Sequence, residues 1–246
     1  MSRFYRASHY QHIHEVEAEH FWFVGRDEMI RGLIGRYVQN PQGKTFLDIG
    51  CGTGVTLEYL EQLKFVATGL DINARALSYA KRRTDSTLVR STIFQYHPKR
   101  PFAALGAFDV MEHIGDDAAF LRQCKNLLIS GGLLFLTVPA EKYLWSSVDV
   151  LSGHKRRYTK DGLRELFAES GLRVRHMGYW NSILLPAYIM WRLMAGKGRE
   201  DLIMQYLTMP NPLFNRILLT ILRADTIIFR GHLPFGASLV VVAEKV

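Results

Sequence analysis

The stretch "FLDIGCGTGVTLEYL", residues 46–60, decides how this chain is expected to fold. A short apolar run contains one acid, Asp48, and glycines follow at positions 50, 52 and 54. Glycine is costly to order because it has the most backbone freedom to lose. Three glycines at alternate positions therefore indicate a sharp turn where a bound group can approach the bare backbone. From residue 55 onward, apolar side chains recur at helical spacing.

The alternation of strand and helix continues along the chain. Short apolar runs bounded by turn residues predict strands at 44–50, 65–71, 87–94, 102–110, 133–140, 172–180 and 237–246. Helical patterns cover residues 10–38 and most of the segments between the strands. Strands and helices that alternate with short connections predict an α/β fold, here a doubly wound, mostly parallel sheet of seven strands.

The expected organisation is a single domain, residues 1–246. Its parts are an N-terminal helical cap (1–43), a cofactor-binding core (44–180), a helical insertion (181–235) and the last strand (236–246). The insertion is far longer than the usual connection between strands, and long insertions are often functional.

Composition restricts the function classes. Hydrophobic residues make up 48% of the chain, and its net charge of +8 leaves a nucleic acid, an anionic membrane or an ordinary basic surface open. The basic clusters are not interleaved with aromatic residues, which disfavours a nucleic acid. Cys51 and Cys124 match no metal spacing, and residues 1–20 contain no apolar secretory core, so a cytoplasmic location is expected.

The glycine turn and the next strand predict a site for an adenosine-bearing ligand. Gly50 and Gly52 leave the backbone bare, and Asp71 ends the second strand, where a carboxylate can accept both hydroxyls of a ribose. A dinucleotide site usually reads G-x-G-x-x-G, but Val55 occupies the third glycine position here. Asp48, two residues before Gly50, suits an ammonium or a sulfonium, which favours S-adenosylmethionine over NAD.

These segments resemble class I S-adenosylmethionine-dependent methyltransferases. The match comprises "LDIGCGTG", Asp71, "FDVMEHI" and "LLISGGLLFLTVP", and it spans roughly residues 44 to 180. The resemblance implies a Rossmann-like methyltransferase fold and the cofactor S-adenosyl-L-methionine. It implies the cofactor-binding residues Asp48, Ile49, Gly50, Cys51, Gly52, Asp71, Ile72 and Asp109. The family often has an acid near the end of the third strand, whereas "STIFQYHPKRPF" has none, so Gln95 or a neighbour serves there or the contact is missing.

Two histidines are the candidates for a general base, because histidine titrates near neutral pH. His113 follows the fourth strand and His154 follows the fifth, at the ligand-facing end of the sheet. A structural hydrogen bond for His113 and a solvated loop position for His154 are the competing readings. Arg157 and Tyr158, with Arg156, could clamp an anionic acceptor or belong to a solvated basic loop. Arg26, with Trp22 and Phe23, could cover the cofactor or reflect ordinary helix packing.

The expected function is methyl transfer to an oxygen or nitrogen of a small molecule. "HFWFVGRDEMI", "SGHKRRYTKDGLRELF" and "LPFGASLVVVAEK" resemble a bacterial subgroup associated with polysaccharide or lipid-linked metabolites. A non-catalytic cofactor-binding protein that supports a partner and a nicotinamide-dependent dehydrogenase are the alternatives. Apolar residues at 214, 217, 218, 221 and 222 predict an amphipathic helix, which packs on the sheet or another subunit, or touches a membrane surface. No metal site is indicated, and an oligomer is possible.

Overall fold

The computed structural model describes residues 7–195, 208–229 and 232–246. Parts of the expected N-terminal cap and of the expected insertion, residues 1–6, 196–207 and 230–231, lie outside the described residues. The division into cap, core, insertion and last strand stays a prediction.

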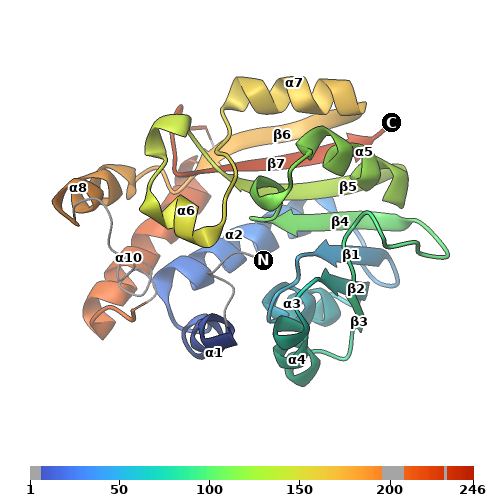
Figure 1. Cartoon of the computed structure of the whole chain (residues 1–246), viewed down its shortest axis with the longest axis horizontal. Coiled ribbons are helices and arrows are strands. Elements are labelled where there is room, and N and C mark those ends of the chain that lie inside the picture. Colours follow the sequence, from blue (N-terminus) through green and yellow to red (C-terminus); the bar gives the residue numbers. More distant parts are fainter. Residues whose placement is uncertain (1–6, 196–207, 230–231) are drawn as a thin grey trace.

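One seven-stranded sheet organises the chain (Figure 1). Its strands are β1 (Thr45–Ile49), β2 (Val66–Asp71), β3 (Thr87–Arg90), β4 (Phe102–Phe108), β5 (Leu128–Pro139), β6 (Leu172–Trp180) and β7 (Ser238–Lys245). They lie in the order β3-β2-β1-β4-β5-β7-β6. The strands from β3 to β5 pair in parallel, and β7 is antiparallel to both β5 and β6. The predicted doubly wound, mostly parallel sheet is confirmed.

Both faces of the sheet are buried, each under its own helices. Along β1, Leu47 faces a first hydrophobic cluster and Phe46 faces a second, as the strand period of two requires. The first cluster includes side chains of α5 (Asp117–Leu127) and α7 (Lys160–Ser170). The second includes α2 (Phe21–Tyr37), α3 (Val55–Gln62) and α10 (Pro212–Ala224). Burial on both faces explains why these strands read as continuous apolar runs.

The remaining helices lie at the edges of this core. They are α1 (Ala7–Val16), α4 (Ala74–Arg83), α6 (Ser147–Ser152) and α8 (Leu185–Ala195), with 3₁₀ turns at Met111–His113 and Lys142–Leu144 and a π turn at Asp225–Phe229. Figure 1 shows α1 and α6 beyond the arrowheads of β1 and β4, where the carboxyl ends of the parallel strands meet.

Three local predictions differ from the structure. The strand expected at 87–94 ends at Arg90. The helix expected at 10–38 is interrupted between α1 and α2, because His20 has extended backbone and accepts a hydrogen bond from the Trp22 N–H. The strand expected from residue 133 begins at Leu128, and its pairing with β4 shifts register between Phe102 and Ala104. Gly131 has a φ of +74° in this irregular section, so the glycines bend the strand rather than precede it.

The predicted apolar face of α10 is divided. Leu222 is fully buried against α2, whereas Phe214 and Ile217 are 55% and 47% exposed. The helix packs on α2 through the side that includes Leu219 and Leu222, since both lie next to Gly25. No helix in the described part of the chain combines the length and the apolar character that a bilayer crossing requires.

We expect Phe46→Ala to lower the free energy of unfolding by about 3–5 kcal/mol, because it opens a cavity in the close-packed second cluster. The matched control is Phe214→Ala, the same change at an exposed helix position, which should stay within about 1 kcal/mol. Urea unfolding of both variants measures the difference. Equal losses of unfolding free energy in the two variants would contradict the burial of Phe46.

Candidate functional site

A cavity of about 910 Å³ opens at the carboxyl ends of the central strands. It is bounded by the strand ends and by residues of α1, α2 and α6. The predicted site residues that line it are Ile49, Gly50, Gly52, Asp71, Ile72, Asp109, His113, His154, Arg26 and Arg157. The structure therefore brings together residues from five separate segments of the sequence.

The glycine turn has the sharply bent backbone conformation that its three glycines predict. Gly50, Gly52 and Gly54 have φ values of +71°, +53° and +86°, in the left-handed region that side chains disfavour. The Gly50 and Cys51 N–H groups donate to the Leu70 carbonyl, at 2.7 and 3.1 Å. A Cβ atom on Gly50 would lie 2.5 Å from Val110 Cγ2, whereas one on Gly52 would meet nothing within 4 Å. Gly52 thus presents bare backbone to the cavity.

Asp71 fixes this turn from the end of β2. Its carboxylate accepts the Gly52 N–H at 3.0 Å and the Asn73 N–H at 2.7 Å. Burial raises the pKa of Asp71, and these backbone hydrogen bonds oppose the rise. A carboxylate oxygen has a second lone pair, so the group can still accept hydroxyls of a sugar from the cavity.

Asp48 and Cys51 do not line the cavity. Asp48 is only 2% exposed, and burial raises its pKa to about 8, although Arg26 opposes the rise. The Cys51 side chain packs in the second hydrophobic cluster, and its Sγ lies near Gly69. Any direct contact of Cys51 with a ligand in the cavity would therefore use its backbone. Gln95 also lies outside the lining, and its side chain accepts from the Thr92 hydroxyl, whereas Thr92 itself lines the cavity.

An ion pair joins α2 to the end of β4 inside the cavity. Arg26 Nε lies 2.6 Å from Asp109 Oδ2, and a second guanidinium nitrogen donates to the Phe108 carbonyl at 2.9 Å. Asp109 has a φ of +58°, which is unfavourable for an L residue, and the Thr137 hydroxyl donates to its other oxygen. The Arg26 guanidinium also lies 5.5 Å from the centre of the Trp22 ring. Trp22, Phe23 and Arg26 all face the cavity, so this helix contributes a wall to the site.

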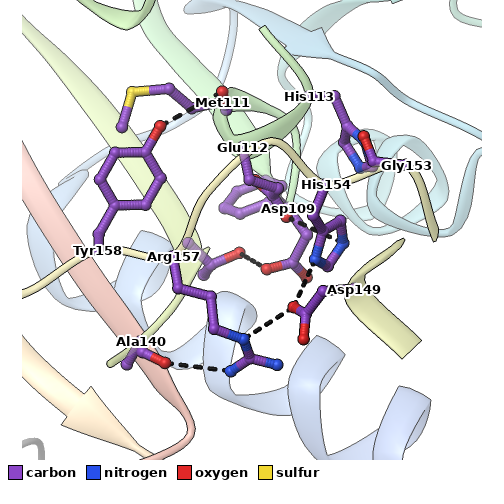
Figure 2. A network of polar contacts seen from close by, with 12 residues as sticks. Asp109, Met111, Glu112, His113, Ala140, Asp149, Gly153, His154, Arg157 and Tyr158 are labelled. Carbon is purple, nitrogen blue, oxygen red and sulfur yellow. Dashed lines mark hydrogen bonds and ion pairs between the residues drawn. The ribbon is translucent and has the colours of Figure 1, made fainter. Parts of the chain in front are cut away.

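The two histidines lie side by side at the other end of the cavity, with ring centres 4.9 Å apart (Figure 2). His154 Nδ1 lies 2.9 Å from Asp149 Oδ1, and His113 Nδ1 lies 3.3 Å from the Gly153 carbonyl. Burial, with His154 nearby, lowers the pKa of His113 to about 4, so this ring is neutral at neutral pH. His154 is a partly buried, hydrogen-bonded residue, which rules out the solvated-loop reading.

Arg157 belongs to the same network. It is 8% exposed, and it donates to Asp149 at 2.7 Å and to the Ala140 carbonyl at 3.0 Å. Burial acts to raise the pKa of Asp149, but hydrogen bonds from His154 and Arg157 outweigh it and lower the pKa to about 2. Arg157 therefore neutralises a buried carboxylate and is not part of a solvated loop.

Tyr158 does not join the predicted site. Its ring belongs to the first hydrophobic cluster, and its hydroxyl lies 3.3 Å from Asp117 Oδ2 and 3.4 Å from the Met111 carbonyl oxygen. Figure 2 shows the second of these contacts. Burial raises the pKa of Tyr158. Arg156 also binds Asp117, at 2.6 Å. Both side chains hold the 154–158 segment against α5, so Tyr158 is a packing residue here and not a cavity contact.

Glu112 and Asp149 were not recognised from the sequence. Glu112 stands next to His113 in "FDVMEHI", and it is fully buried and lines the cavity. A carboxylate adjacent to a candidate histidine, just after a central strand, was the signal that could have identified it. Asp149 gave no such signal, because only the short helix α6 brings it to His154 and Arg157.

Comparison with known proteins places this chain among methyltransferases. The protein-family model described as "Methyltransferase domain" matches residues 17–177. A ubiquinone biosynthesis O-methyltransferase from Glaesserella parasuis is 31% identical over 106 residues, which cover 39% of this chain and 45% of that protein. The chain spans about half the length of the curated relatives it matches.

Solved structures share the fold. An S-adenosylmethionine dependent methyltransferase from Mesorhizobium loti has a TM-score of 0.58 at 17% identity, over 87% of this chain and 96% of that one. Magnesium protoporphyrin IX methyltransferase from Synechocystis, with bound SAM, has a TM-score of 0.52 at 18% identity, over 64% and 74% of the two chains. The expected Rossmann-like methyltransferase fold is confirmed.

We expect alanine at the two cavity glycines to have opposite dominant effects. Gly50→Ala should mainly destabilise the protein, because its methyl group overlaps Val110 in addition to the left-handed strain. Gly52→Ala should cost only about 1–2 kcal/mol of stability, but should weaken binding of S-adenosylhomocysteine roughly tenfold, about 1.4 kcal/mol. Thermal unfolding and calorimetric titration measure the two effects. Unchanged affinity in Gly52→Ala would place the ligand elsewhere.

Proposed function

Because the chain belongs to the methyltransferase domain family, we propose that it transfers a methyl group from S-adenosylmethionine to an oxygen atom of a small molecule. Family membership confirms the predicted class and the predicted cofactor. One observation carries the proposal for this chain. A single cavity joins the glycine turn and Asp71 to the pair formed by His113 and His154. The groups suited to bind the cofactor and the groups suited to bind the acceptor thus line the same cavity.

The cavity walls fit the cofactor. The bare backbone at Gly52 and the Asp71 carboxylate offer a close approach and two acceptors for a ribose, and Ile72 adds an apolar surface beside them. When bound, S-adenosylmethionine supplies an electrophilic methyl group. Arg26 and Asp109 form an ion pair at the end of β4, and both residues line the same cavity.

The opposite end fits an acceptor oxygen. His113 is neutral at neutral pH, and His154 is oriented by Asp149, so both rings can engage a hydroxyl group or its proton. Positioning the acceptor oxygen against the methyl group can supply much of the rate of such a displacement. An oxygen acceptor benefits from groups that weaken its O–H bond, which supports oxygen over nitrogen. The resemblance to O-methyltransferases points the same way.

The acceptor proposed here is a hydrophobic molecule with an acidic hydroxyl, such as an alkyl-substituted phenol or catechol. Tyr10, Ile13, Trp22, Phe23 and Tyr188 contribute to the cavity lining, and this apolar surface suits a lipid-like or aromatic body better than a bare saccharide. Leu213, Phe214, Ile227 and Ile228 are exposed on and after α10. They support contact with a membrane surface or a second copy, and both stay predictions.

We expect Asp71→Ala to weaken S-adenosylhomocysteine binding by about 1.5–3 kcal/mol, the range for a lost hydrogen bond to a charged group. The matched control is Asp85→Ala, an exposed acid that follows α4 and does not line the cavity. Calorimetric titration measures both affinities, and circular dichroism checks that each variant is folded. If Asp71→Ala binds as tightly as the control, the ribose is held by other groups.

The acceptor class is tested with S-adenosylmethionine that carries a labelled methyl group. An alkyl phenol and the alkyl aniline of the same chain length form a matched pair that differs in the accepting atom. The proposal expects label in the phenol and little or none in the aniline. Methylation of the aniline alone would overturn the oxygen assignment, and cofactor binding without transfer to any hydroxyl would favour a non-catalytic role.

A further inference from the structure

Three potential metal ligands converge on the acceptor end of the cavity. Each of Glu112, His113 and His154 has one ligand atom within 4.8 Å of those of the other two. They come from the 3₁₀ turn after β4 and from the loop after α6, and all three line the cavity (Figure 2). Two ligands of one ion lie at most about 4.2 Å apart, twice the usual bond length, so small side-chain rotations can close this set on an ion.

Glu112 is the first reason to assign a cation here. Its side chain is fully buried, and neither carboxylate oxygen has a hydrogen-bond partner among the described residues. The nearest histidine nitrogen, His154 Nε2, lies 3.9 Å from Oε1, which is beyond hydrogen-bond length. A buried polar group without a partner is costly, and such groups are rare in folded proteins.

The neighbouring guanidinium groups do not meet this need. Arg157 donates to Asp149 and to the Ala140 carbonyl, and Arg26 donates to Asp109 and to the Phe108 carbonyl. Each arginine thus has its own carboxylate partner. Glu112 is therefore a cavity-lining carboxylate to which neither arginine donates a hydrogen bond.

The second reason is the orientation of the two imidazole rings. A carbonyl oxygen can only accept a hydrogen bond, so His113 Nδ1 carries the proton that it donates to Gly153. The Asp149 carboxylate, which is paired with Arg157, likewise accepts from His154 Nδ1. With Nδ1 as the donor, Nε2 is the nitrogen of each ring that can bind an ion. A carboxylate or carbonyl behind a histidine that fixes its tautomer and orientation is the usual support of a metal ligand.

We propose that Glu112, His113 and His154 bind a divalent first-row transition metal ion such as Zn²⁺ or Mn²⁺. Two imidazole nitrogens and one carboxylate suit these ions, whereas Mg²⁺ and Ca²⁺ prefer oxygen ligands. Three protein ligands leave coordination positions open toward the cavity, as in catalytic metal sites. The acceptor oxygen would occupy one of them.

The catalytic part of this inference rests on the proposed function, but metal binding does not. Coordination to the ion would lower the pKa of the acceptor hydroxyl, and its proton would leave to solvent water. The oxygen would keep the electron pair, which then forms the bond to the methyl carbon as the bond from that carbon to sulfur breaks and S-adenosylhomocysteine leaves. This assignment replaces the general-base role predicted for the histidines, because a metal-bound Nε2 has no lone pair left for a proton.

The test is calorimetric titration of the chelator-treated full chain with Zn²⁺, followed by Co²⁺ as a spectroscopic probe. We expect one ion per chain, visible absorption bands with Co²⁺, and much weaker binding of Mg²⁺. Glu112→Gln keeps the shape of the side chain and should weaken Zn²⁺ binding at least tenfold. His154→Gln should do the same, and it keeps the test valid if the first variant does not fold. The matched control is His176→Gln, in β6 and outside this cavity, which should bind as the wild type does.

The outcomes separate the two proposals. Absence of Zn²⁺ binding, or binding that neither ligand variant weakens, overturns the metal site even if S-adenosylhomocysteine still binds and methyl transfer is observed. Zn²⁺ binding that both variants weaken supports the site, even if no hydroxyl is methylated. In that second case the proposed function fails and the metal site stands.

Discussion

The left-handed turn between β1 and α3 is the constraint on which the site depends. Gly50, Gly52 and Gly54 all have positive φ, and the Gly50 and Cys51 N–H groups share the Leu70 carbonyl at the end of β2. The turn is therefore fixed to the neighbouring strand as well as to its own. Because the carboxyl ends of parallel strands meet at one edge, this fixed turn, Asp71 and the segment after β4 reach the same space. The cavity follows from the turn and the sheet together.

Around this turn, charged groups are buried mostly as matched pairs. Arg26 holds Asp109 in an unfavourable backbone conformation, and Arg157 shares Asp149 with His154. Breaking one partner of such a pair leaves an uncompensated charge in the interior, which is more costly than the pair is stabilising. Glu112 departs from this arrangement, since its oxygens have no hydrogen-bond partner among the described residues. An unmatched polar group in an otherwise matched network is where a ligand is to be sought.

The sequence predicted the sheet well because its signals are local. Apolar runs, glycines and an acid at the end of a strand each locate a strand or a turn to within a few residues. The interruption before α2 was missed, since His20 caps the helix through one side-chain contact that periodicity does not reveal. Arg157 and Tyr158 are adjacent in the sequence, yet one faces the cavity and the other packs in the core. Which neighbour points inward depends on α6 and α5, and pairings of distant segments leave no mark in a single sequence.

The contact between α2 and α10 constrains how two positions of this sequence can evolve. A Cβ atom on Gly25 would lie 2.9 Å from a Leu222 methyl carbon, so the two helices touch where one has no side chain. Arg26 is the next residue, and it pairs with Asp109. A change at position 25 to alanine or serine requires Leu222 to shift, and a smaller residue at position 222 would relieve the overlap. Related genes should record these two sites changing together, although almost 200 positions separate them along the polypeptide.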